Sequence, residues 1–94
     1  EDFQKGMTAS DAVLIDVRSQ GEFQSGKIKG ARNIDIMSSG FINQIQNLPK
    51  DKKYYLYCRS GNRSGQACSL MAKNGFENVN NLADGIMGWP YDIV

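Results

Sequence analysis

Length, composition and charge limit what this chain does. Its 94 residues suffice for one domain with a single core, and we predict one domain over residues 1–94. Eleven basic and ten acidic residues give a formal net charge of +1, which argues against nucleic acid or a membrane surface as a partner. No apolar run approaches the ~18 residues of a membrane span and no signal peptide is visible, so we expect a cytoplasmic protein. The start at Glu1 leaves open a trimmed chain, a mature form or a domain of something longer.

The chain has no histidine and only two cysteines, and these counts restrict its chemistry. Without histidine it supplies no Ser-His-Asp or Cys-His mechanism and no histidine-ligated metal site. Two cysteines ten positions apart are a poor disulfide framework and cannot form a four-cysteine zinc site. We therefore predict no metal and no cofactor. A cysteine nucleophile in this chain must be activated without a histidine base.

The first third of the chain predicts a short helix, a buried strand and a second short helix. Residues 3–7 are compatible with a brief helix. Residues 12–15 form a compact apolar run that is typical of a buried parallel strand. Ser19 and Glu22 have the spacing of a helix capping box, and Gly26 closes the turn that follows.

The middle of the chain predicts a short strand, a helix and a second buried strand. Residues 30–34 lie between turns and suit a short strand. A helical stripe comes next, which Pro49 should end. Residues 54–57 are an aromatic-rich run that suits a buried strand. The stripe consists of Phe41, Ile42, Ile45 and Leu48.

The last third predicts one longer helix, a short strand and a closing turn. Ala67, Leu70 and Met71 have helical spacing, and Gly75 supplies a helix stop. Residues 76–79 suit a short strand. Residues 84–89 suit a turn or short helix that ends in Trp89, whose ring we expect to pack on the core.

Strands alternating with short helices predict an α/β domain with a largely parallel central sheet and helices on both faces. In such sheets ligands bind beyond the carboxyl ends of the strands. Cys58, Asp16 and Arg18 all fall at predicted carboxyl ends, so we expect them to be neighbours.

The polar turn at residues 58–63 joins a predicted strand to a predicted helix and begins with Cys58. If the helix starts there, backbone N–H groups of residues 59–64 point at the sulfur, and the helix amino end favours an anion. Arg59 and Arg63 add positive charge, so the pKa of Cys58 should fall below its free value of ~8.5. The alternative for Cys58 is a buried small apolar side chain. For Cys68, inside the helix, that structural interpretation is preferred.

These motifs together resemble a single-domain rhodanese of the rhodanese-like sulfurtransferase family, and they cover nearly the whole chain in the family's order. The resemblance implies an α/β fold around a parallel sheet and a persulfide on Cys58. The family often has histidine at the position of Lys27, a glycine pair at Asp84-Gly85, and a first strand that this chain lacks, which suggests a trimmed amino end. The matching residues are 14–18, 22–23, 26–31, 33–34, 57–64 and 82–89.

The resemblance implies a two-step sulfur transfer. The Cys58 thiolate attacks the outer sulfur of a small donor, thiosulfate or a persulfide, and an acceptor then takes that sulfur. The acceptor is cyanide or a thiol, including a thioredoxin-like or sulfur-relay protein. We predict that Cys58 is catalytic and that the residues after it bind substrate. These substrate-binding candidates are Arg59, Ser60, Gly61, Asn62, Arg63 and Ser64.

Competing interpretations apply to Arg63, Asp16 and Arg18. Arg59 and Arg63 suit a donor oxyanion through paired N–H bonds, although Arg63 equally suits a solvated helix start. Asp16 either accepts hydrogen bonds from the turn after Cys58 or belongs to an internal ion pair. For Arg18 we favour a structural ion pair with Glu22 that fixes the strand end.

Other functions remain open alongside the sulfurtransferase. One is a persulfide carrier or docking module in a sulfur relay, which the sequence does not separate from a turnover enzyme. A cysteine phosphatase or arsenate reductase of related fold is less favoured. The phosphatase signature, by resemblance, places arginine six residues after the cysteine, whereas Arg63 follows Cys58 by five. The shorter step makes a tighter cradle that fits a single sulfur better than a phosphate.

Overall fold

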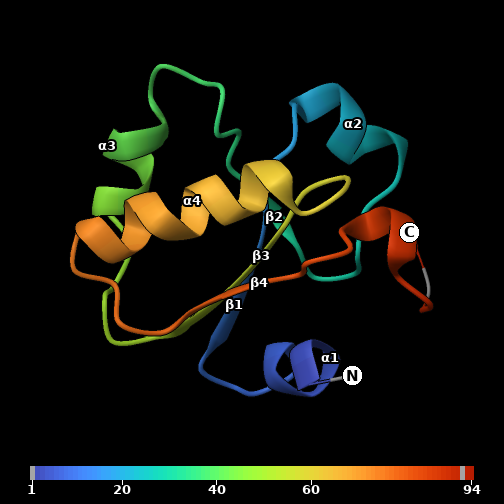
Figure 1. The fold of residues 1–94 in the computed structure, drawn as a ribbon, viewed down its shortest axis with the longest axis horizontal. Coiled ribbons are helices and arrows are strands. Elements are labelled where there is room, and N and C mark those ends of the chain that lie inside the picture. The colour runs from blue at the N-terminus through green and yellow to red at the C-terminus, as the bar shows by residue number, and fades with distance from the viewer. Residues whose placement is uncertain (1, 92) are drawn as a thin grey trace.

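The computed structural model describes residues 2–91 and 93–94, and its centre is a four-stranded parallel sheet (Figure 1). The strand order is β2-β1-β3-β4. Asp16 pairs with Asn33 on one side and with Tyr57 on the other, so three strands end at the same edge. The strands are β1 (Ala12–Asp16), β2 (Arg32–Asn33), β3 (Lys53–Tyr57) and β4 (Val79–Asn81).

Helices cover both faces of this sheet, as the sequence predicted. Helices α3 and α4 lie on the opposite side of the sheet from α1 (Figure 1). Phe3 of α1 packs with Tyr55 at one face, whereas Met71 of α4 packs with Leu56 at the other. The helical elements are α1 (Asp2–Met7), α2 (Gln20–Ser25), α3 (Phe41–Gln46), α4 (Asn62–Lys73) and the short 3₁₀ helix η1 (Ile86–Gly88).

Strand β3 runs through the centre and contributes to two apolar clusters. Leu56 and Tyr54 join the cluster under α3 and α4, and Tyr55 and Tyr57 join the cluster with α1. This alternation explains why the strand is aromatic and apolar along almost its whole length, since both of its faces are covered. The Tyr57 hydroxyl accepts a hydrogen bond from the Ile28 N–H at 3.1 Å, so Tyr57 is a structural residue.

The predicted capping signals are present at two helices. The Ser19 hydroxyl accepts from the Glu22 N–H, and the Glu22 carboxylate accepts from the Ser19 N–H, which completes a capping box at α2. Gly75 has a φ of +94° just after α4 and so takes the left-handed conformation expected at a helix stop.

The end of α3 differs from the prediction. The helix ends at Gln46, three residues before Pro49, because a residue that precedes proline avoids the helical region and the chain leaves the helix early. Leu48 therefore packs against the core from outside the helix. Trp89 packs on the cluster around Tyr57, as expected. Within the described residues, no helix combines the length and apolar character that crossing a membrane requires.

Two isoleucines of α3 allow a direct test of this packing. Ile45 is fully buried, whereas Ile42 is 37% exposed although both belong to the predicted stripe. We predict that Ile45→Ala lowers the free energy of unfolding by about 2–5 kcal/mol through lost contacts and a cavity. Ile42→Ala, the matched control on the same helix, should cost less than about 1 kcal/mol. Urea unfolding measures both, and equal costs would contradict the assignment of the core face.

Candidate active site

Cys58 follows β3 at the carboxyl edge of the sheet and is only 1% exposed. Its neighbour in the sheet is the end of β1, where the Val17 N–H donates to the Tyr57 carbonyl at 3.0 Å. Helix α4 begins four residues later, at Asn62. The strand, polar turn and helix predicted from sequence are therefore present. We call residues 58–61 the thiol loop.

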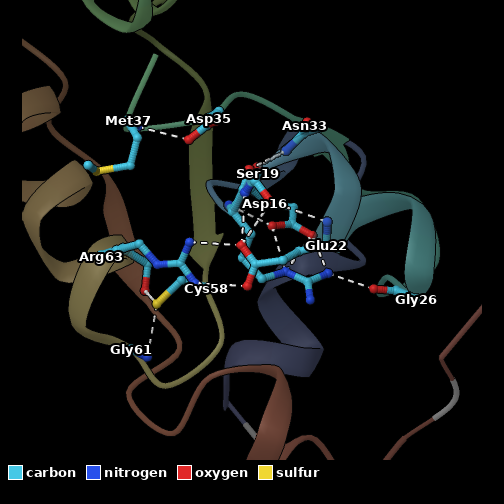
Figure 2. Close-up of polar contacts among 12 residues, drawn as sticks. Asp16, Ser19, Glu22, Gly26, Asn33, Asp35, Met37, Cys58, Gly61 and Arg63 are labelled. Carbon is cyan, nitrogen blue, oxygen red and sulfur yellow. Dashed lines mark hydrogen bonds and ion pairs between the residues drawn. The ribbon is translucent and has the colours of Figure 1, made fainter.

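Hydrogen-bond donors of the thiol loop and of α4 surround the Cys58 sulfur. The Gly61 N–H lies 3.0 Å from Sγ (Figure 2). The Ser64 hydroxyl lies 3.4 Å from Sγ. Burial acts to raise the pKa of Cys58, but bonds from the Ser64 hydroxyl and from the N–H groups of Ser64, Ser60 and Gly61 outweigh it. The pKa is thus lowered, the direction expected from sequence, and backbone and hydroxyl donors are the main cause.

The end of β4 and the start of η1 hold the backbone of the thiol loop. The Ile86 N–H donates to the Cys58 carbonyl at 2.9 Å, and the Met87 N–H donates to the Arg59 carbonyl at 3.2 Å. The Asn81 side chain donates to the Gly61 carbonyl at 3.2 Å. These three hydrogen bonds hold the backbone of the thiol loop in one shape. Sequence reasoning missed Asn81 in this role, because nothing local links it to Cys58.

Two glycines allow this close approach. Gly61 has a φ of +96°, and a Cβ added there would lie 2.0 Å from the Ala83 carbonyl oxygen. Gly85 has a φ of +67°, and its added Cβ would lie 2.1 Å from the Arg59 carbonyl oxygen. Both positions combine a left-handed backbone with contact to another backbone, which only glycine tolerates. The Asp84-Gly85 pair in the sequence was a signal for this turn.

Ser64 connects the sulfur to the edge strand. Its hydroxyl is within bonding distance of Cys58 Sγ and also donates to the Asn81 side-chain oxygen. A hydroxyl has one proton, so it serves one of these acceptors at a time. An ionised sulfur is the stronger acceptor, and ionisation of Cys58 therefore competes with the bond to Asn81.

Arg63 is paired with Glu22 across the site. Two guanidinium nitrogens meet the two carboxylate oxygens at 2.9 and 3.1 Å (Figure 2). Hydrogen bonding to Arg63 is the main reason that the pKa of Glu22 falls to about 2. Both partners are therefore charged throughout the neutral pH range. Glu22 was expected to meet Arg18, and this part of the prediction is wrong.

Arg18 instead forms a buried pair with Asp16. Its guanidinium bonds both carboxylate oxygens of Asp16, the shortest distance being 2.7 Å, and also the Gly26 carbonyl at 2.6 Å. The guanidinium also lies over the Tyr57 ring. Arg18 precedes α2, so the four-residue helical spacing to Glu22 does not bring the two together. Among the described residues, the hydrogen bonds of the Asp16 carboxylate go to Arg18 and none goes to the thiol loop, which favours the ion-pair interpretation over direct shaping of that loop.

The remaining candidates lie at the mouth of the site. Arg59, Ser60 and Asn62 are exposed. The Arg59 Nε lies 3.4 Å from the Met87 sulfur, and no carboxylate among the described residues forms a salt bridge with it. Arg59 is therefore the cation of the thiol loop that is available to a ligand.

Cys68 differs from Cys58 in the direction in which its surroundings shift its pKa. It is half-buried in α4, and burial raises its pKa to about 11. Both cysteines are free thiols. In the part of the chain that the structure describes, no three His, Cys, Asp or Glu side chains gather in a way that would hold a metal ion.

Comparison with protein families matches residues 1–91 to the rhodanese-like domain. The chain belongs to the rhodanese-like family. A sulfurtransferase of Allochromatium vinosum is 34% identical over 86 residues, which are 92% of this chain and 78% of that protein. Protein YqhL of Bacillus subtilis is 41% identical over 90 residues, 95% of this chain and 68% of that protein.

Other relatives extend the rhodanese-like comparison to longer proteins and to solved structures. A tRNA uridine(34) hydroxylase of Bacillus cereus is 32% identical over 98% of this chain, which spans only 30% of that protein. The crystal structure of a rhodanese-related protein from Thermoplasma volcanium has a TM-score of 0.85 at 31% identity, covering 99% of this chain and 91% of that one. A rhodanese with anions from E. coli has a TM-score of 0.73 at 26% identity, covering 88% and 96%. The rhodanese fold predicted from sequence is confirmed.

The two cysteines should titrate separately. We predict that alkylation of Cys58 by iodoacetamide has a midpoint below the ordinary pKa of a thiol, while Cys68 reacts only near pH 11. Ser64→Ala, in a Cys68→Ala background, should raise the Cys58 midpoint by about one unit because a donor to the thiolate is lost. Ser69→Ala on the exposed side of α4 is the control. If the midpoint is unchanged in Ser64→Ala, the Ser64 hydroxyl does not lower the pKa of Cys58.

Gly61→Ala tests the close packing of the thiol loop. The added methyl requires a left-handed alanine and collides with the Ala83 carbonyl, so we expect a loss of at least about 1–2 kcal/mol in unfolding free energy. The displaced Gly61 N–H should also raise the pKa of Cys58. Gly21→Ala is the control, because nothing lies within 4 Å of its added Cβ and it sits in α2. Urea unfolding measures the loss of stability and thiol titration measures the pKa of Cys58. If Gly61→Ala and Gly21→Ala change both quantities equally, the close contact of Gly61 with Ala83 does not shape the thiol loop.

Proposed function

We propose that this rhodanese-like domain is a sulfurtransferase that carries a sulfane sulfur on Cys58 as a persulfide. The observation that carries this proposal is the cluster of donors, Gly61 N–H and Ser64 hydroxyl, around a sulfur of lowered pKa at the start of α4. Such donors stabilise an anionic sulfur without a histidine base. The sulfurtransferase of Allochromatium vinosum supports the same chemistry.

The proposed reaction has two steps, each a displacement at sulfur. The Cys58 thiolate attacks the outer sulfur of the donor, the donor's S–S bond breaks, and its electron pair leaves on sulfite when the donor is thiosulfate. The terminal sulfur of the Cys58 persulfide is then attacked by a nucleophile, cyanide or a thiol, and the Cys58 thiolate is regenerated. Arg59 is the exposed cation that would meet an oxyanion donor at the mouth of the site.

A persulfide carrier within a sulfur relay is the second candidate. In the tRNA uridine(34) hydroxylase of Bacillus cereus the matching region is 30% of the protein, so a rhodanese-like domain also occurs as part of a longer protein. A carrier would load Cys58 in the same way and would pass the sulfur to a protein thiol, such as that of a thioredoxin-like or relay protein, and only slowly to cyanide.

Intact mass measurement after incubation with a sulfane donor tests the proposal. We predict that the wild-type protein gains one sulfur atom and that Cys58→Ala gains none, whereas Cys68→Ala behaves as wild type. Subsequent cyanide should remove the sulfur as thiocyanate if the protein is a turnover enzyme. Loading without thiocyanate formation would favour the carrier. Failure to load from thiosulfate and from an alkyl persulfide would overturn both versions.

A further inference from the structure

The Arg63 guanidinium is already bound before any substrate arrives. It meets Glu22 in a bidentate pair, and the two side chains are 29% and 33% exposed. A planar guanidinium that binds one carboxylate through two nitrogens presents its best anion-binding edge to that carboxylate. Glu22 thus occupies the place on Arg63 that the oxyanion of a sulfur donor would need.

Glu22 is held in this position by its own helix. Its Oε1 accepts from the Ser19 N–H and from the Ser19 hydroxyl, each at 3.1 Å, as part of the capping box of α2. The carboxylate therefore has partners on both sides and is not a freely rotating surface group. An entering anion must displace a carboxylate whose position is fixed by α2.

A second carboxylate adds to the negative charge near Arg63. Asp35 acts on Arg63 through space, as Glu22 and the Cys58 sulfur do. Asp35 also lines an open hollow of about 460 Å³ beside α2 and α3. Apart from the apolar Phe23, the other lining residues are polar and uncharged, so none of them is lysine or arginine. They include Gln20, Asn33, Ser38 and Gln44. The residues that line this hollow offer no positive charge to a dianion, and Cys58 and Arg63 are not among them.

We propose that Glu22 determines the class of sulfur donor, by neutralising Arg63 so that alkyl persulfides are preferred over oxyanion donors such as thiosulfate. The inference rests on the proposed function of Cys58. With a persulfide, the thiolate attacks the outer sulfur of RS–SH, whose S–S bond breaks. The products are the Cys58 persulfide and RS⁻, which takes a proton from water. The reactive donor RS–SH is uncharged, whereas thiosulfate brings two negative charges to a thiolate that Arg63 no longer offsets.

Glu22→Gln releases Arg63 with little change in shape. Glutamine still accepts the Ser19 N–H, since a capping box accepts either residue. The test compares loading of Cys58, followed by intact mass, from thiosulfate and from the persulfide of N-acetylcysteamine. We expect the ratio of the two rate constants, thiosulfate over persulfide, to rise about tenfold or more, the usual effect of one hydrogen bond to a charged group. Glu77→Gln, which removes an exposed carboxylate elsewhere, should leave the ratio unchanged.

A double-mutant cycle separates this role from a structural one. If Glu22 acts through Arg63, Arg63→Gln in the Glu22→Gln background should return the ratio to about the wild-type value. Arg63→Gln alone leaves the Glu22 carboxylate without its partner and should lower the ratio or leave it unchanged, but should not raise it. A ratio that stays constant in Glu22→Gln, or that rises without needing Arg63, would overturn the inference and leave the proposed function intact. Absence of loading from both donors in the wild type would remove the proposed function and this inference together.

Discussion

The hydrogen bond from the Gly61 N–H to the Cys58 sulfur is the contact on which the rest of the site depends. It exists only because Gly61 takes a left-handed conformation directly before α4, so that the chain reverses and its N–H points back at the strand end. Asn81 and the turn around Gly85 hold the same loop from behind. The activation of the thiol is therefore a property of backbone shape, and it persists in a chain without histidine.

The charges around the thiol loop are mostly cancelled in pairs. Asp16 neutralises Arg18 inside the domain, and Glu22 neutralises Arg63 nearer the surface. The buried Asp16–Arg18 pair adds little net stability, but removal of one partner would leave a costly isolated charge. The result is a nucleophile whose stabilisation comes mainly from neutral dipoles. Arg59 is the exposed cation of the loop, at its outer rim.

The features that sequence predicts well are those formed by residues that are neighbours in the sequence. The strand at residues 54–57, the turn after Cys58 and the capping box of Ser19 each involve a few neighbouring positions, so local rules identify them. The pairing of Arg63 with Glu22 joins positions 41 residues apart, and no periodicity encodes it. The error at Arg18 is of another kind, because its partner Asp16 lies only two residues away and the sequence does not show which nearby carboxylate the guanidinium meets.

The single proton of the Ser64 hydroxyl has a consequence beyond activation. Each change of charge on the sulfur alters which acceptor that proton serves, and Asn81 is the alternative acceptor. Asn81 also belongs to β4 and bonds the thiol loop through its amide. The environment of Asn81 on the edge strand therefore depends on the charge of the Cys58 sulfur. The NMR resonance of the Asn81 side-chain amide would show whether the sulfur is protonated, ionised or loaded, although Asn81 does not contact the sulfur itself.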